Sequence, residues 1–108
     1  RPVPVEGSAR VLPADLVFLA MGFTGPETAI MQDELAVEVD ARGALVRGDD
    51  YSTSVDGLFV AGDAGRGQSL IVWAIAEGRA AAASVDRYLT GKTNLPSPIP
   101  ASARPLTV

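Results

Sequence analysis

A short apolar run at residues 58–61 leads directly into Gly62-Asp63, followed by a glycine-broken loop and a proline-free, alanine-rich segment at residues 69–89. The run has the length of a buried strand, and Gly91 is the residue type favoured just beyond a helix C-terminus. This order predicts a strand, a loop and one long helix, as in an α/β fold. In open α/β sheets, ligands bind where the carboxyl end of a strand meets a helix N-terminus, so this loop is the candidate site.

Two other parts of the chain have strand patterns. Residues 16–21 are a continuous apolar run that ends at Gly22, which indicates a strand buried on both faces. Residues 37–40 alternate apolar and acidic side chains, and residues 44–46 follow Gly43, so a β-hairpin is expected there. These patterns add strands and one hairpin to the predicted fold.

The remaining segments are less regular. Residues 29–35 favour a short helical turn. Prolines alternate along residues 96–100 and exclude both a continued helix and a central strand. We expect residues 92–108 to form a proline-rich, extended tail that lies over another part of the protein.

Small residues recur along the long helical segment at spacings of three and four, namely Ala74, Gly78, Ala81 or Ala82, and Val85. A helix face lined in this way can lie close on a sheet. Glycine in a helix interior costs about 1 kcal/mol, so Gly78 indicates close packing or a cofactor at its position.

The composition excludes several kinds of chemistry. The 108 residues contain no Cys and no His, and so no thiolate nucleophile, iron–sulfur ligand or imidazole base. We therefore expect no catalytic residue and no metal site, with the chemistry supplied by a cofactor. The net charge of −4 and the lack of a basic cluster argue against a nucleic-acid partner. No apolar run is long enough to cross a membrane and no leader pattern is present, so a cytoplasmic, non-membrane protein is predicted.

The candidate loop suits a polyhydroxyl ligand. Asp63 follows the strand and can accept hydrogen bonds from a ribityl chain, while Gly62 allows close approach of the backbone. The first N–H groups of the helix, near Ser69 and Leu70, can stabilise negative charge on a reduced flavin. Simpler roles stay open: Asp63 as a loop cap, Ser69 as an N-cap and Trp73 as a core residue.

Residues 53–63, Thr-Ser-Val-Asp-Gly-Leu-Phe-Val-Ala-Gly-Asp, resemble the second flavin-binding motif of the two-dinucleotide-binding-domain flavoproteins. Residues 67–79, Gly-Gln-Ser-Leu-Ile-Val-Trp-Ala-Ile-Ala-Glu-Gly-Arg, are similar to the small subunit family of bacterial glutamate synthase. Residues 14–27 resemble the crossover at which that family's chain returns from its NADPH domain to its FAD domain. The resemblance extends from about residue 11 to about residue 91.

This resemblance implies a fold and a division of the chain. Residues 1–108 are expected to be a single fragment from the C-terminal portion of an FAD-binding, Rossmann-like flavoprotein. Within it, residues 11–22 would be the crossover strand, residues 23–91 the C-terminal part of the FAD-binding domain and residues 92–108 the tail. In the parent protein, FAD would accept hydride from NADPH. Iron–sulfur clusters would then carry electrons to a large subunit that makes glutamate from 2-oxoglutarate and glutamine.

The resemblance also implies roles for particular residues. Asp63, with Gly62 before it, would bind the ribityl chain of FAD. The run Gln68-Ser69-Leu70 would lie against the isoalloxazine, and Gly22 with Phe23 would lie near the domain crossover. Gly65 departs from the family pattern, in which a basic residue is usual after Gly-Asp-Ala.

Parts of a complete flavin enzyme are lacking in this sequence. It has no Gly-x-Gly-x-x-Gly fingerprint for FAD or NADPH and no Cys for a cluster. We therefore expect the chain alone to bind no cofactor firmly and to be inactive, with the rest of the small subunit and the large subunit as partners. We also expect an exposed strand edge at residues 11–22 to pair two copies of the chain. The alternatives are a fragment of a related NADPH-ferredoxin oxidoreductase-type flavoprotein and a non-catalytic interaction module that retains the fold.

Overall fold

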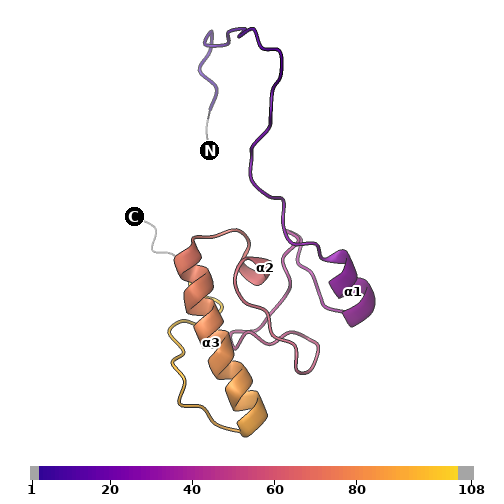
Figure 1. Cartoon of the computed structure of the whole chain (residues 1–108), viewed down its shortest axis with the longest axis vertical. Coiled ribbons are helices and arrows are strands. Elements are labelled where there is room, and N and C mark those ends of the chain that lie inside the picture. Colours follow the sequence, from indigo (N-terminus) through magenta and orange to yellow (C-terminus); the bar gives the residue numbers. More distant parts are fainter. Residues whose placement is uncertain (1–2, 105–108) are drawn as a thin grey trace.

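The computed structural model describes residues 3–104 and contains three helices within them: α1 (Ala29–Leu35), α2 (Asp63–Arg66) and α3 (Ile71–Thr90). An N-terminal arm extends away from a compact part that holds the helices (Figure 1). The radius of gyration of 19.0 Å exceeds the roughly 13 Å typical of a compact domain of about 100 residues. The arm accounts for this difference.

The expected long helix is present as α3. Its C-terminus is Gly91, which adopts the left-handed conformation (φ 80°) while its N–H donates to the Arg87 carbonyl (2.8 Å). Alanines and two polar residues, Glu77 and Ser84, form the buried side of the helix. Gly78 is exposed, and a Cβ there would meet nothing within 4 Å. The close packing that we expected at Gly78 is therefore wrong for this structure.

The expected hairpin is present, but its two arms are joined by a single isolated bridge and not by regular strands. Val39 and Leu45 form an isolated antiparallel bridge, and the Asp40 N–H donates to the Ala44 carbonyl (2.8 Å). Gly43 takes the positive φ of 82° that the turn requires. The Asp40 carboxylate accepts from the Ala44 N–H and from the Arg42 side chain and N–H, and these hydrogen bonds lower the pKa of Asp40.

The expected strands are not formed within residues 3–104. Residues 58–61 contribute only an antiparallel bridge, between Ser52 and Phe59, and α/β layering is absent from the described part. Residues 16–21 are assigned to no strand, and their apolar side chains are largely exposed. For residues 16–21 the cause is that a strand needs a hydrogen-bonded neighbour, and no backbone hydrogen bond between described residues involves residues 9–27.

The core consists of two small apolar clusters on either side of residues 58–61. One joins Tyr51 to alanines of α3 and to Ala101, and the other joins Val37, Leu45 and Val60. The segment after Gly91 runs back along α3 (Figure 1), where the Tyr51 hydroxyl donates to the Ile99 carbonyl (2.9 Å). Residues 58–62 are thus held between the hairpin and α3.

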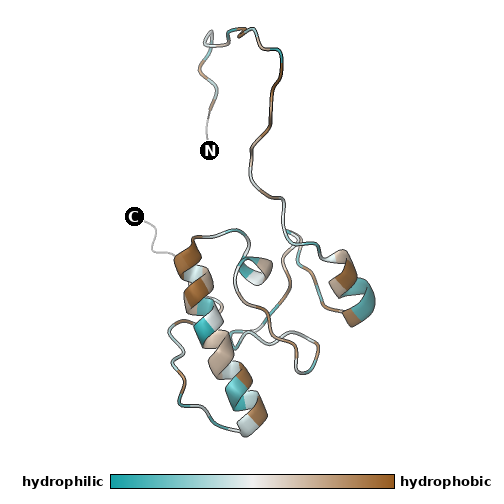
Figure 2. Cartoon of the chain, viewed as in Figure 1, coloured by the Kyte–Doolittle hydropathy of each residue, from teal (hydrophilic) through white to brown (hydrophobic). Residues whose placement is uncertain are grey.

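Apolar side chains are exposed in two places. Figure 2 shows hydrophobic residues along the arm and over the first turns of α3. The latter include Leu70, Ile71, Val72 and Ile75, each more than half exposed. No described helix combines the length and the hydropathy that crossing a membrane requires.

Candidate flavin site

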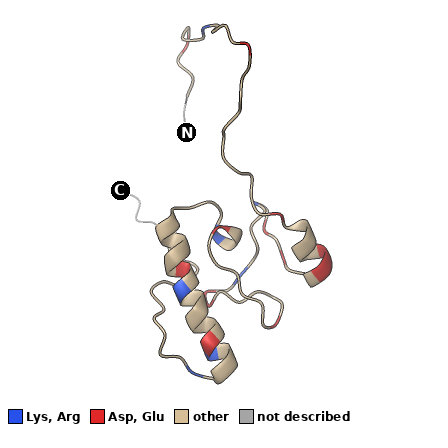
Figure 3. Ribbon diagram, in the orientation of Figure 1, with Lys and Arg blue, Asp and Glu red and all other residues tan. Residues whose placement is uncertain are grey.

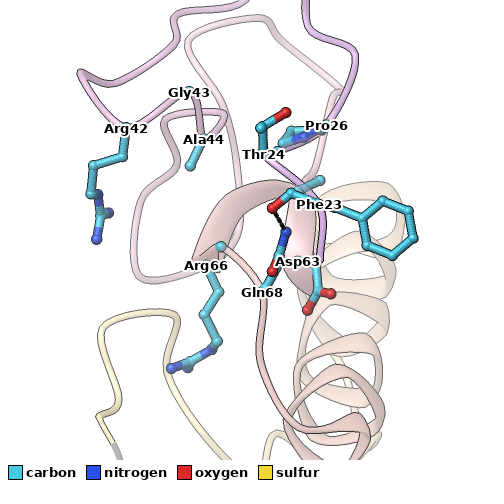
Figure 4. Close-up of a pocket in the computed structure, with 12 residues that line it drawn as sticks. Phe23, Thr24, Pro26, Arg42, Gly43, Ala44, Asp63, Arg66 and Gln68 are labelled. Carbon is cyan, nitrogen blue, oxygen red and sulfur yellow. Dashed lines mark hydrogen bonds between the residues drawn. The ribbon is translucent and has the colours of Figure 1, made fainter. Parts of the chain in front are cut away.

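A cavity of about 420 Å³ lies where the arm, the hairpin turn and α2 meet. Figure 4 shows the side chains around it. Its lining comes from three segments of the chain: Phe23, Thr24, Gly25 and Pro26; Arg42, Gly43 and Ala44; and Asp63, Ala64, Arg66, Gly67 and Gln68. Much of the wall is backbone or small side chain, so a ligand can approach the main chain closely.

Asp63 is the acidic group of this cavity. It is the first residue of α2, and its Oδ1 accepts a hydrogen bond from the Ser69 hydroxyl (3.1 Å). Its Oδ2 has no hydrogen-bond partner among residues 3–104. The residue that caps α3 is Leu70, without a side-chain cap bond, so Ser69 does not cap the helix. Ser69 instead orients the Asp63 carboxylate.

Gln68 joins the arm to the loop. Its side-chain amide donates to the Phe23 carbonyl (Figure 4), and its Oε1 lies 3.6 Å from where a Cβ of Gly22 would be. The structure thus brings Gly22, Phe23 and Gln68 together beside Asp63. Leu70 lies outside this group: it is 70% exposed. With Ser69 and Trp73 it lines a second cavity, which shares Arg42, Arg66 and Gln68 with the first.

Behind the cavity lies a buried ion cluster centred on Glu77, the only acid on the buried side of α3. Its Oε2 accepts from Arg47 Nη1 (2.8 Å) and from the Gly62 N–H (2.8 Å). Its Oε1 accepts from Arg47 Nη2 (2.9 Å) and from Arg66 Nε (2.5 Å). The Glu77 side chain is 0% exposed, and those of the two arginines are 5% and 6% exposed. The cluster therefore carries two positive charges and one negative charge out of water.

The surroundings shift the pKa of Glu77 and that of the neighbouring Tyr51 in opposite directions. Burial alone would raise the pKa of Glu77, but the hydrogen bonds from Arg47, Gly62 and Arg66 outweigh burial and lower it. Each guanidinium also lies over an aromatic ring, Arg47 over Tyr51 (5.1 Å) and Arg66 over Trp73 (4.4 Å). Burial and the Glu77 charge raise the pKa of Tyr51, so the phenol stays neutral. Arg66 Nη2 is buried without a partner in the described part of the chain.

Sequence reasoning missed this cluster and the role of the hairpin turn. One signal was available for Glu77, because it is a charged residue in register with Ala80, Ala81 and Ser84, the buried stripe of α3. Most of α3 is uncharged (Figure 3), so a charge on that stripe indicates a buried partner. No local pattern points to Arg47, which is 30 residues away from Glu77.

Gly65 has a structural explanation. A Cβ built on Gly65 would lie 2.7 Å from Arg47 Nε and 2.8 Å from its Cδ, closer than such atoms can approach. Arg47 is held in that place by Glu77 and by the Val60 carbonyl (2.9 Å). The space that a side chain at position 65 would need is therefore filled by Arg47.

The site thus combines the Gly62-Asp63 corner at the start of α2, a cavity beside it and the long helix α3 behind it. The model of the pyridine nucleotide-disulphide oxidoreductase family matches residues 3–78, and the chain belongs to this family. It is 64% identical to the glutamate synthase (NADPH) small chain of Mycobacterium tuberculosis H37Rv, over 96% of this chain and 21% of that protein. These two results confirm the resemblance drawn from the motifs.

Two more relatives extend the comparison. The glutamate synthase (NADPH) small chain of Bacillus subtilis is 51% identical, over 85% of this chain and 18% of that protein. The putative oxidoreductase AegA of Escherichia coli is 41% identical, over 86% of this chain and 15% of that protein. The chain thus spans about a fifth or less of the length of these relatives. Among residues 3–104, no three His, Cys, Asp or Glu side chains are placed to bind a metal.

Proposed function

We propose that this chain supplies the ribityl-contacting part of an FAD site in the electron-input subunit of a glutamate synthase. The observation that carries the proposal is the Asp63 carboxylate, which lines the cavity with one oxygen held by Ser69 and the other without a partner among the described residues. The names of two relatives, glutamate synthase (NADPH) small chains, support the assignment of the parent protein.

The residues of the cavity fit part of a flavin dinucleotide. A volume of about 420 Å³ is within the range of small-molecule sites, about 300–1,000 Å³. A charged acceptor matches a chain of hydroxyl groups, because each hydroxyl can donate one hydrogen bond to it. The pyrophosphate would need a Gly-x-Gly-x-x-Gly loop from another part of the parent protein, since this sequence has none.

On this proposal, the chain binds and orients the cofactor and supplies no acid or base. FAD, when bound, accepts a hydride from a reduced nicotinamide. Asp63 would hold the ribityl chain, and the Gln68–Phe23 contact would keep the arm against the cavity. The loop before α3 would place Ser69 and Leu70 toward the isoalloxazine. The large subunit would be the electron acceptor, by way of iron–sulfur clusters outside this chain.

A related electron-transfer flavoprotein is the second candidate, because the chain is also similar to a putative oxidoreductase. The two candidate functions differ in the protein that accepts the electrons. The full-length protein that carries this sequence should support NADPH-dependent glutamate formation from glutamine and 2-oxoglutarate when it is combined with a glutamate synthase large subunit. NADPH oxidation with an artificial acceptor, but no glutamate formation with the large subunit, would favour the second candidate.

The 108-residue chain alone is expected to bind FAD weakly or not at all and to oxidise no NADPH, because it holds only part of the site. Equilibrium dialysis against FAD measures this directly. Stoichiometric yellow flavin in the purified chain would contradict the division of the site.

Asp63→Ala in the full-length protein should weaken FAD binding by about 1–3 kcal/mol, or about 5- to 150-fold in Kd, because a charge-assisted hydrogen bond is lost. Flavin fluorescence titration of the flavin-free protein gives the Kd. Asp33→Ala is the matched control, since Asp33 is an exposed acid on α1 whose side chain makes no hydrogen bond to any described residue. Equal Kd values for the two variants would refute the role of Asp63.

A further inference from the structure

We propose that Glu77 is a positioning residue for the candidate flavin site, and that it acts by holding both ends of α2. This inference rests on the proposed function, because the site it serves is the FAD site assigned above. Glu77 itself is fully buried and does not line the cavity, so its effect on a ligand has to pass through other residues.

One carboxylate spans the short helix that bears Asp63. Oε2 of Glu77 accepts from the N–H of Gly62, the residue that caps α2, at 2.8 Å. Oε1 accepts from Nε of Arg66, the last residue of α2, at 2.5 Å. A helix of four residues has too few internal hydrogen bonds to keep its own geometry. Bonds from outside the helix therefore set its orientation: those to Glu77 at its two ends, and the one that the Leu45 N–H donates to the Ala64 carbonyl (2.8 Å) in its middle.

Arg47 makes the arrangement rigid from the other side. Its two terminal nitrogens bind both oxygens of Glu77, which is the bidentate geometry that fixes a carboxylate in one plane. Arg47 Nη1 also donates to the carbonyl of Val60, two residues before Gly62. Arg47 and Glu77 thus bind both α2 and the residues that lead into it, 60–62.

The backbone at Gly62 passes this restraint on to Asp63. Gly62 has φ 69° and ψ −150°, a conformation that is essentially restricted to glycine. Its N–H bond to Glu77 keeps this corner in place, and Asp63 is the next residue. Without the carboxylate, the Gly62 N–H is buried without a partner and two guanidinium groups lie together without a counter-charge. The corner and the direction of the Asp63 side chain should then change.

The test uses the full-length protein that carries this sequence, with FAD as the probe. Glu77→Gln removes the charge at nearly constant size, and flavin fluorescence titration should give a Kd raised by about 10-fold or more. The decisive measurement is the coupling between positions 63 and 77 in FAD binding. Asp63→Ala should raise the Kd for FAD about 5- to 150-fold in the wild type, but less than about 3-fold in the Glu77→Gln background. Asp86→Asn, an equal charge change on the same helix, should leave Kd unchanged.

The outcomes distinguish a role of Glu77 in positioning Asp63 from a role in stabilising the fold alone. If Asp63→Ala costs the same factor in both backgrounds, Glu77 stabilises the fold alone and the inference is overturned. An unchanged Kd for Glu77→Gln overturns it as well. If Glu77→Gln does not fold, Glu77→Asp, which keeps the charge but shortens the reach, takes its place in the same cycle with the same expected loss of coupling. A wild-type protein that binds no FAD overturns the proposed function, and this inference with it.

Discussion

Arg47→Ala should lower the free energy of unfolding of the chain by about 3 kcal/mol. Breaking a buried ion pair by removing one partner costs about 3–5 kcal/mol, because the other charge stays buried. We expect the lower end of that range since Arg66 still pairs with Glu77 after the change. The Val60 carbonyl also loses its donor. Urea denaturation followed by the circular dichroism of α3 gives the free energy.

Arg79→Ala is the matched control, because Arg79 is an exposed arginine on α3 with no ion pair in the described part of the chain. It should change the free energy by less than about 0.5 kcal/mol. Equal unfolding midpoints for the two variants would show that the Arg47–Glu77 pair does not stabilise the fold.

The contact between Arg47 and Gly65 predicts that changes at these two positions have non-additive effects on the free energy of unfolding. Gly65→Ala should destabilise the wild type by about 1–3 kcal/mol, since the new Cβ displaces the Arg47 side chain. In the Arg47→Ala background the methyl group has room, and its cost should nearly vanish. Additive effects in this double-mutant cycle would contradict the explanation given for Gly65.

Gly62→Ala should be the most damaging change at any glycine of the site. The φ of 69° with ψ −150° costs a non-glycine residue about 1–3 kcal/mol, although the Cβ itself would sit at an ordinary 3.7 Å from the Ala74 Cβ. The backbone can relieve the strain only by moving the N–H away from Glu77, which adds the cost of an unpaired buried donor, about 1–3 kcal/mol. The two costs add up to an expected loss of about 2–6 kcal/mol, and we expect weaker FAD binding in the full-length protein.

Gly78→Ala is the contrasting control. Gly78 lies within α3, is exposed and has nothing within 4 Å of an added Cβ, so alanine should stabilise the helix by up to about 1 kcal/mol. Urea midpoints that shift in opposite directions for the two glycines are the expected result. Destabilisation by Gly78→Ala would restore the close packing that the sequence suggested at this position.

The sequence determined those features that depend on neighbouring residues alone. The alanine-rich composition, the absence of proline and the terminal glycine predicted α3, because each of these acts within one or two helical turns. Gly43 likewise predicted a hairpin turn through its own φ. The motifs at residues 53–63 and 67–79 identified the family, which the match over residues 3–78 confirms, since motif and family are both properties of the sequence.

Tertiary structure decided what depends on distant partners. The apolar run at residues 16–21 has the composition of a strand, yet it forms none here because hydrogen bonding in a sheet requires a neighbouring strand. The buried cluster joins Arg47, Arg66 and Glu77, and only the folded chain brings these charges within 3 Å of one another. The Gly62-Asp63 corner is therefore encoded locally, whereas its orientation depends on a carboxylate 15 residues further along the chain.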